Sequence, residues 1–233
     1  MSSQVDHARA RRLAGWLGWL AVRIAPPRCL LCDGWDCSDG LDLCRQCQLD
    51  LPAASLAWQA GDPPLAATFS PWRYDYPVDR LVRALKFHGD RSVARTFGTL
   101  LARRRRAGAG PLPEWIVPVP LHPERLRERG YNQADEIARH VAAELGLRRQ
   151  PHALRRIRAT PAQSGLAAAD RRRNLADAFV AGSQHPQRAS PAGRRIALID
   201  DVVTTGSTAR AAAAALRAAG AAGVELWTLA RAE

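Results

Sequence analysis

Lysine is nearly absent from this chain of 233 residues. Lys86 is the single lysine among 34 basic residues, so arginine carries almost all of the positive charge. Long apolar runs are missing as well. The most apolar stretch, residues 13–27, is interrupted by Arg23 and closed by Pro26 and Pro27, and it falls short of the ~20 residues that span a bilayer. This shortage excludes a membrane span in that stretch.

Residues 1–28 also lack the end of a signal peptide. A basic start is followed by an apolar stretch, but no small-residue cleavage pattern precedes Cys29. We therefore expect a cytoplasmic protein whose residues 1–28 form a short helix docked on the body of the chain.

The composition is that of a soluble globular protein, with 47% hydrophobic and 24% charged residues. The formal net charge of +12 favours polyanionic partners such as nucleic acid or phosphorylated small molecules. A basic surface without any partner is the alternative.

All five cysteines lie within residues 29–52. Two Cys-x-x-Cys pairs, Cys29 with Cys32 and Cys44 with Cys47, are separated by eleven residues. Such pairs can bring four thiolates around one structural Zn²⁺, and with all four positions filled the ion would not activate water. Cys37 is left over. Disulfides are the alternative, which a reducing cytoplasm disfavours.

The remaining chain, residues 60–233, predicts one α/β domain. Residues 60–80 carry scattered prolines and aromatics and suggest a crossing into that domain. Helix-like and strand-like segments then alternate, which predicts a parallel sheet with helices on both faces. Strands are expected at 115–119, 194–200 and 224–230, and a helix at 132–146. The Arg103–Arg106 run suggests a helix end followed by a loop.

The segment 194–208, RRIALIDDVVTTGST, carries the clearest chemistry. Its apolar strand ends at Asp200 and Asp201, and in a parallel sheet ligands bind beyond the carboxyl ends of the strands. The following TTGST precedes an alanine-rich helix, and a helix N-terminus with free amides and hydroxyls suits a phosphate. The two carboxylates can accept hydrogen bonds from neighbouring sugar hydroxyls. The predicted ligand therefore joins a ribose to a phosphate.

Other readings of this segment fit less well. The glycine-lysine spacing of a P-loop is absent, and Gly206 stands alone where a dinucleotide fingerprint needs three glycines. A receiver domain also has paired acids, but it would need most of its sheet after Asp201. A strand capped by polar residues without function stays open.

This segment resembles the phosphoribosyl pyrophosphate (PRPP) signature of type I phosphoribosyltransferases. Together with the motifs at 84–91, 117–139 and 156–179 and the cysteine cluster, it is similar to the ComF competence-protein family over residues 29–229. The resemblance implies a zinc ribbon at 29–52 joined to a type I phosphoribosyltransferase-like domain. It also implies binding of PRPP with Mg²⁺ and a role in natural transformation, with single-stranded DNA and competence-machinery proteins as partners.

The resemblance also assigns residues. Asp200 and Asp201 would act at the ribose. The 5′-phosphate would lie on Thr204, Thr205, Gly206, Ser207 and Thr208. A pyrophosphate loop would contain Arg125, Arg127, Arg129, Gly130 and Asn132, and a flap over PRPP would contain Arg158, Thr160, Gln163 and Arg173. Lys86 is a further candidate, because one lysine among so many arginines suggests a need for an ammonium group.

Three functions remain open at this level: an active transferase with an unknown acceptor, a protein that handles single-stranded DNA, and a non-catalytic PRPP sensor. Members of the fold that act on 6-oxopurines have an acid where Thr204 stands, which argues against that acceptor.

Overall fold

The computed structural model describes residues 28–37, 39–108, 110–158, 177–182 and 190–232. The chain divides into two compact units, with the boundary between Asp50 and Leu51. Within the described ranges no helix has both the length and the apolar character needed to cross a membrane.

The first unit is built from two cysteine turns. The first turn closes through a hydrogen bond from the Cys29 amide to the Gly34 carbonyl at 2.9 Å. The second leads into the short helix α2 (Arg45–Leu49), whose N-cap is Cys44. An antiparallel bridge pairs Cys37 with Cys44. Few apolar side chains are buried in the described part of this unit, so we expect its fold to depend on the cysteine cluster.

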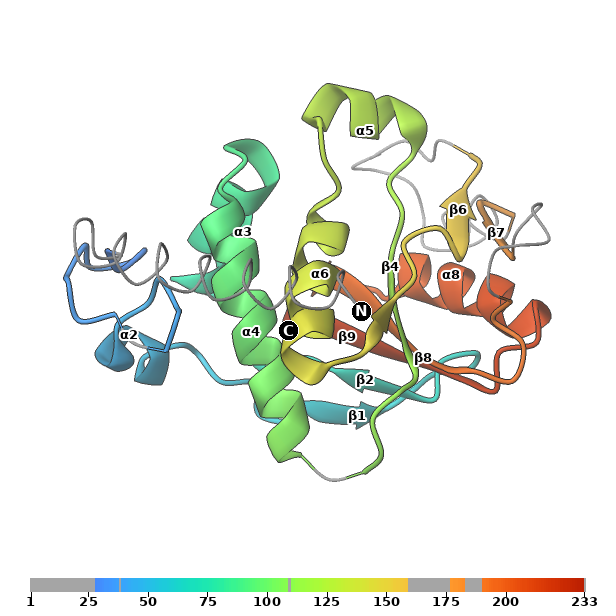
Figure 1. The fold of residues 1–233 in the computed structure, drawn as a ribbon, viewed down its shortest axis with the longest axis horizontal. Helices are drawn as coiled ribbons and strands as arrows, with labels where there is room; N and C mark the ends of the chain where they lie inside the picture. The colour runs from blue at the N-terminus through green and yellow to red at the C-terminus, as the bar shows by residue number, and fades with distance from the viewer. Residues whose placement is uncertain (1–27, 38, 109, 159–176, 183–189, 233) are drawn as a thin grey trace, which may run out of the picture. The chain divides into compact units, whose positions relative to one another are not determined.

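The second unit is built around a seven-stranded sheet in the order β1-β2-β9-β8-β4-β5, with β3 also paired to β9 (Figure 1). Its strands are β1 (Trp58–Ala60), β2 (Ala67–Phe69), β3 (Trp72–Arg73), β4 (Trp115–Pro118), β5 (Arg148–Arg149), β8 (Arg195–Val203) and β9 (Gly223–Arg231). All pairings are parallel except that of β1 with β2. The predicted α/β class is confirmed, with a mixed sheet in which parallel pairing predominates.

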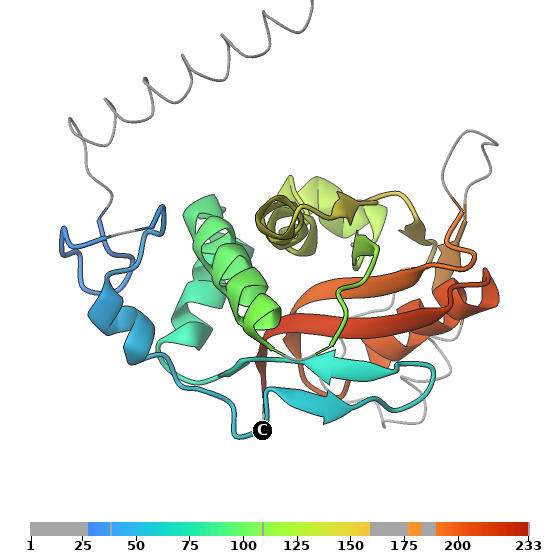
Figure 2. The same ribbon diagram turned by 60° about the horizontal axis from the view of Figure 1, so that its bottom comes forward.

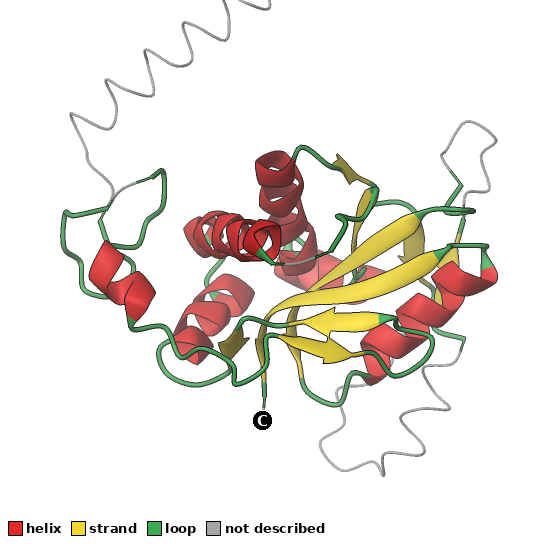
Figure 3. Ribbon diagram, turned by 90° about the horizontal axis from the view of Figure 1, so that it is seen from below, coloured by secondary structure: helices red, strands yellow, loops and turns green. Residues whose placement is uncertain are grey.

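Helices cover both faces of this sheet (Figure 3). One face carries α4 (Arg91–Ala107) and α6 (Gln133–Leu145), and the other carries α8 (Ser207–Ala218) (Figure 2). Two shorter helices, α3 (Val78–Phe87) and α5 (Pro123–Arg129), and a separate antiparallel pair, β6 (Leu154–Arg156) with β7 (Phe179–Ala181), complete the unit. The helices α4 and α6 pack closely, because a methyl group on Gly98 would lie 2.9 Å from the Ile137 carbonyl oxygen.

The expected strands and helix form for the reasons in the sequence. Strand β4 ends at Pro118, and its last bond to β8 runs from the Val119 amide to the Ile199 carbonyl at 2.9 Å, just before Pro120, which cannot donate to a ladder. Helix α6 begins after Asn132, whose Oδ1 accepts from the Ala134 amide at 3.1 Å, and ends at Gly146 in the left-handed conformation.

Residues 60–80 do more than cross between parts of the chain. They include the end of β1, all of β2 and β3, and the start of α3. These strands have only two or three residues each, so they leave no alternating pattern in the sequence. The predicted crossing therefore contains short strands that the sequence did not indicate.

The Arg103–Arg106 run belongs to the last turns of α4, which continues to Ala107. Arg105 is 1% exposed, and its guanidinium lies 5.0 Å from the Trp58 ring centre and 5.2 Å from the Trp227 ring centre. Arg103 pairs with the Glu144 carboxylate at 3.2 Å, and Arg106 donates to the Glu144 carbonyl. Much of this positive charge therefore stabilises the fold.

Candidate functional site

The hydroxyl-rich loop after β8 forms a small pocket at the carboxyl end of the sheet. Asp200 and the loop from Val202 to Ala209 line it. The Thr205 hydroxyl lies 3.0 Å from the Ser207 hydroxyl, and both precede or begin α8. Because the first amides of a helix have no partner within it, this pocket presents donors to an anion. The structure thus brings Asp200 and the predicted phosphate loop together.

Gly206 is the N-cap of α8 and has a φ of 69°. A left-handed conformation of this kind costs an L-residue roughly 1–2 kcal/mol, so glycine is favoured here. A methyl group on Gly206 would lie 3.2 Å from a guanidinium nitrogen of Arg210. The loop therefore depends on glycine for its turn, and a methyl group there would also press on the Arg210 side chain.

The two adjacent acids point to opposite faces of the sheet, as alternation along a strand requires. Asp200 lies on the α8 side and lines the phosphate-loop pocket. Asp201 is 4% exposed and pairs through its Oδ2 with Lys86 Nζ at 3.1 Å. Its Oδ1 accepts from the Val202 amide at 2.7 Å. The two acids are adjacent in the sequence but therefore lie in two different surroundings.

Burial and the neighbouring Asp201 carboxylate raise the pKa of Asp200 to about 7. The Asp201 amide, which donates to Asp200 Oδ1 at 2.9 Å, and the charges of Lys86 and Arg156 oppose this rise. A cation or a hydrogen-bond donor arriving at this carboxylate would favour its ionised form.

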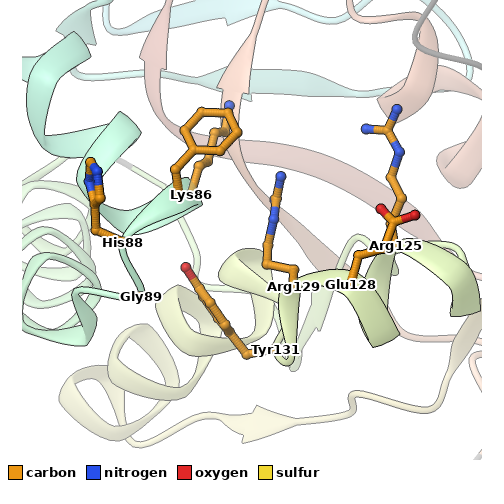
Figure 4. A pocket seen from close by; sticks show the side chains of 8 residues that line it. Lys86, His88, Gly89, Arg125, Glu128, Arg129 and Tyr131 are labelled. Atoms are coloured by element: carbon orange, nitrogen blue, oxygen red, sulfur yellow. The ribbon is translucent and has the colours of Figure 1, made fainter.

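A larger pocket of about 540 Å³ lies near Lys86 (Figure 4). Its lining comes from the end of α3, from α5 and from the segment after α5, and consists of Lys86, Phe87, His88, Gly89, Arg125, Glu128, Arg129 and Tyr131. Three cations against one carboxylate suit an anionic ligand. Since Lys86 also pairs with Asp201, this pocket is connected to β8, the strand that leads into the predicted phosphate loop.

The predicted pyrophosphate-loop residues take different places. Arg125 and Arg129 line the larger pocket, whereas Arg127 is exposed on α5 and does not. Gly130 ends α5 in the left-handed conformation. Asn132 caps α6 and donates to the Val119 carbonyl at 3.0 Å, so both polar groups of its side chain make hydrogen bonds within the protein.

Of the predicted flap, Arg158 is described and lies 3.9 Å from the Asp177 carboxylate. Thr160, Gln163 and Arg173 lie outside the described residues.

Two residues at the pockets carried no clear signal in the sequence. Arg210, in the first turn of α8, lies beside Gly206 and pairs with Asp62 at 3.6 Å. Tyr131 lines the larger pocket. An arginine one turn into the helix after the loop could have suggested the first, but only the tertiary structure places the second in a pocket with Lys86.

The four cysteines of the two pairs come together in the first unit. Their sulfur atoms all lie within 4.8 Å of one another, and Cys37 is not among them. The Cys32 and Cys44 sulfurs are 3.7 Å apart. Sulfurs at about 2.3 Å from a tetrahedral Zn²⁺ would be about 3.8 Å apart, so the cluster fits that ion.

The surroundings of Cys29 favour a metal-ligating thiolate. Burial raises the pKa of this thiol, but backbone amides outweigh that effect, among them the Cys44 amide 3.4 Å from the sulfur, and lower the pKa to about 6. Cys37 differs, since burial and the neighbouring Cys29 raise its pKa to about 11.

Together these features define an α/β domain with a mixed, mostly parallel sheet, preceded by a unit in which four cysteine sulfurs converge. Competence protein F of Haemophilus influenzae is 37% identical over 166 residues, which cover 68% of this chain and 70% of that protein. DNA utilization protein YhgH of Salmonella typhi is 36% identical over 200 residues, covering 82% and 85% respectively. The YhgH protein of Escherichia coli K12 is 35% identical over 198 residues, covering 81% and 84%. The chain belongs to the family of competence protein F and YhgH.

Solved structures are more distantly similar. A glutamine PRPP amidotransferase from B. subtilis, complexed with ADP and GMP, aligns at 20% identity with a TM-score of 0.38. The alignment covers 58% of this chain and 25% of that chain. No protein-family model matches the chain.

Proposed function

We propose that this protein binds PRPP across the two pockets of the second unit. The 5′-phosphate lies on the Thr204–Thr208 loop, and the diphosphate lies near Lys86, Arg125 and Arg129. The observation that carries this proposal is the Lys86–Asp201 ion pair, because it joins the cationic pocket to the strand that ends in the phosphate loop. A ligand with anionic groups at both ends and a sugar between them fits this arrangement.

Mg²⁺ would accompany the diphosphate. Asp200 is the carboxylate that such a cation would stabilise in its ionised form, since burial and Asp201 otherwise disfavour that form. When bound, the ion neutralises charge on the diphosphate. In the first unit, Cys29, Cys32, Cys44 and Cys47 would hold a structural Zn²⁺.

The phosphate assignment can be tested with two matched glycine variants. Gly206 and Gly146 have φ values of 69° and 68°, but Gly146 ends α6 and lines neither pocket. Alanine should cost roughly 1–2 kcal/mol of stability at each position. Isothermal titration should show PRPP affinity at least about tenfold weaker in Gly206→Ala and unchanged in Gly146→Ala. Unchanged affinity in folded Gly206→Ala would refute the phosphate site.

The cellular role that we propose is the handling of single-stranded DNA in the cytoplasm during DNA uptake. The names competence protein F and DNA utilization protein support it, as does the net charge of +12. Trp35 is 57% exposed, with the Arg28 guanidinium 4.2 Å from its ring centre. An exposed aromatic ring beside a cation suits an unpaired base and its phosphate.

Binding of DNA should depend on salt. Arg103, Arg105 and Arg106 make contacts within the fold, so we do not count them toward DNA binding. We expect the other cations to neutralise about three phosphates, which gives a slope of about −2 for the logarithm of the binding constant against the logarithm of salt concentration. Fluorescence anisotropy with a labelled single strand would measure it. Trp35→Ala should weaken binding about tenfold or more, while the matched variant Leu49→Ala, at a residue 70% exposed in the same unit, should not. A flat salt response, or equal effects of the two variants, would reject this role.

An active transferase with an unknown acceptor is the second candidate function, and a PRPP sensor without catalysis is the third. Thr204 is exposed, and its side chain has no carboxylate that could exchange a proton with an acceptor base. Release of diphosphate from PRPP in the presence of candidate bases separates the second function from the third.

A further inference from the structure

Phe87 presents an aromatic ring to solvent at the larger pocket. It is the last residue of α3, lines the pocket and is 72% exposed. The apolar residues that α3 buries are Val78, Leu81, Val82 and Leu85. Because an α-helix has about 3.6 residues per turn, Phe87 lies on the opposite side of α3 from them. The ring is therefore left out of the core and is available to a ligand.

PRPP would leave this ring uncovered. It consists of a ribose and phosphate groups, and it has no aromatic or apolar part that could lie on Phe87. The ring nevertheless lies beside positive charge, because the Arg129 guanidinium is 5.7 Å from its centre. Arg129 is held there by donating to the Gln133 side-chain oxygen at 2.7 Å. The pocket therefore combines a fixed cation with an exposed aromatic ring.

This combination matches an unpaired nucleotide. Any base can stack on an aromatic ring, and the phosphate beside the base can lie on an arginine. Arg125 lines the same pocket, and Figure 4 shows Arg125 and Arg129 extending from α5 in the same direction. A neutral free base would use only the ring, whereas a nucleic-acid strand also brings phosphates to these cations. The pocket volume of about 540 Å³ is large enough for one nucleotide.

We propose that the larger pocket is a binding site for single-stranded DNA, in which a base stacks on Phe87 and the adjoining phosphate lies on Arg125 and Arg129. The proposed PRPP site places the diphosphate near the same two arginines. DNA and PRPP therefore exclude each other from this pocket, and PRPP weakens the binding of a strand. This inference rests on the proposed binding of PRPP and the proposed handling of DNA.

The test measures the fluorescence anisotropy of a labelled single strand with the full chain. Phe87→Ala should weaken binding about tenfold or more, whereas Phe87→Tyr, which keeps a ring, should bind like the unchanged protein. Leu56→Ala, at a residue 66% exposed that lines neither pocket, is the matched control. A strand with the same phosphates but without bases should bind equally to Phe87→Ala and to the unchanged protein. Saturating PRPP should weaken binding of the normal strand by a factor similar to that of Phe87→Ala.

The outcomes separate this inference from the functions on which it rests. Equal affinity of the strand for Phe87→Ala and the unchanged protein, or no effect of PRPP, would overturn it. A matching loss of PRPP affinity in Phe87→Ala, measured by isothermal titration, would show a disturbed pocket and would overturn it too. If the unchanged protein binds PRPP but no strand, the DNA role itself fails. If adenine then binds in the presence of PRPP and loses affinity in Phe87→Ala, the ring serves an acceptor base instead. If the protein binds the strand but not PRPP, the PRPP site fails, and the Phe87 variants still decide the DNA site.

Discussion

Replacing Cys44 with serine is expected to remove the metal and unfold the first unit. Cys44 contributes one sulfur to the cluster and is also the N-cap of α2. Among the described residues up to Asp50, the buried apolar side chains are few: Cys29, Leu41, Leu43 and Cys44. A core of this size cannot offset the entropy of ordering the chain, whereas a structural Zn²⁺ contributes about 10–16 kcal/mol.

Metal analysis and hydrogen exchange would measure this effect. The Cys44→Ser protein should contain no zinc and exchange the amides of residues 28–50 rapidly, while the second unit keeps its protection. Cys37→Ser is the matched control and should retain one equivalent, since that sulfur is outside the cluster. Loss of zinc from Cys37→Ser, with retention in Cys47→Ser, would contradict the ligand set.

Replacing Arg105 with methionine should lower the free energy of unfolding of the second unit by about 3 kcal/mol. The buried guanidinium lies over two tryptophan rings and donates to the Pro111 carbonyl at 2.8 Å. Desolvated cation–π contacts are worth about 2 kcal/mol or more, and a hydrogen bond from a charged group adds about 1.5–3 kcal/mol, partly offset by the cost of burying the charge.

The next residue supplies the comparison. Arg106 is exposed and donates to the Glu144 carbonyl, so Arg106→Met should cost less than about 1 kcal/mol. Denaturant unfolding followed by tryptophan fluorescence would compare the two variants. Equal losses would show that the burial of Arg105 between the rings is not what stabilises the protein.

Several structural features followed from the sequence because their causes are local. The alternation of segments predicted the α/β sheet, and proline, asparagine and glycine set the ends of β4 and α6. The loop after Asp200 forms a pocket at a helix N-terminus because strand, glycine and helix are consecutive. The spacing of the cysteines likewise predicted which four sulfurs converge.

Other features depended on contacts between distant segments. Asp201 meets Lys86 across 115 positions of the chain (201 − 86), and the sequence around each residue gave no sign of this pair. The sequence predicted a helix end at the Arg103–Arg106 run but gave no sign that Arg105 is buried, because the tryptophans that enclose it come from β1 and β9.

The sequence by itself determined the class of fold, which four cysteines converge and the loop at the N-terminus of α8, since each arises from neighbouring residues and their backbone preferences. Only the tertiary structure decided how the charges are used. Alternation along β8 separates Asp200 from Asp201, and the tertiary structure brings Lys86 and Tyr131 into one pocket. The physical reason is that burial and long-range pairing set the energy of a charged group far more than its neighbours in the chain do.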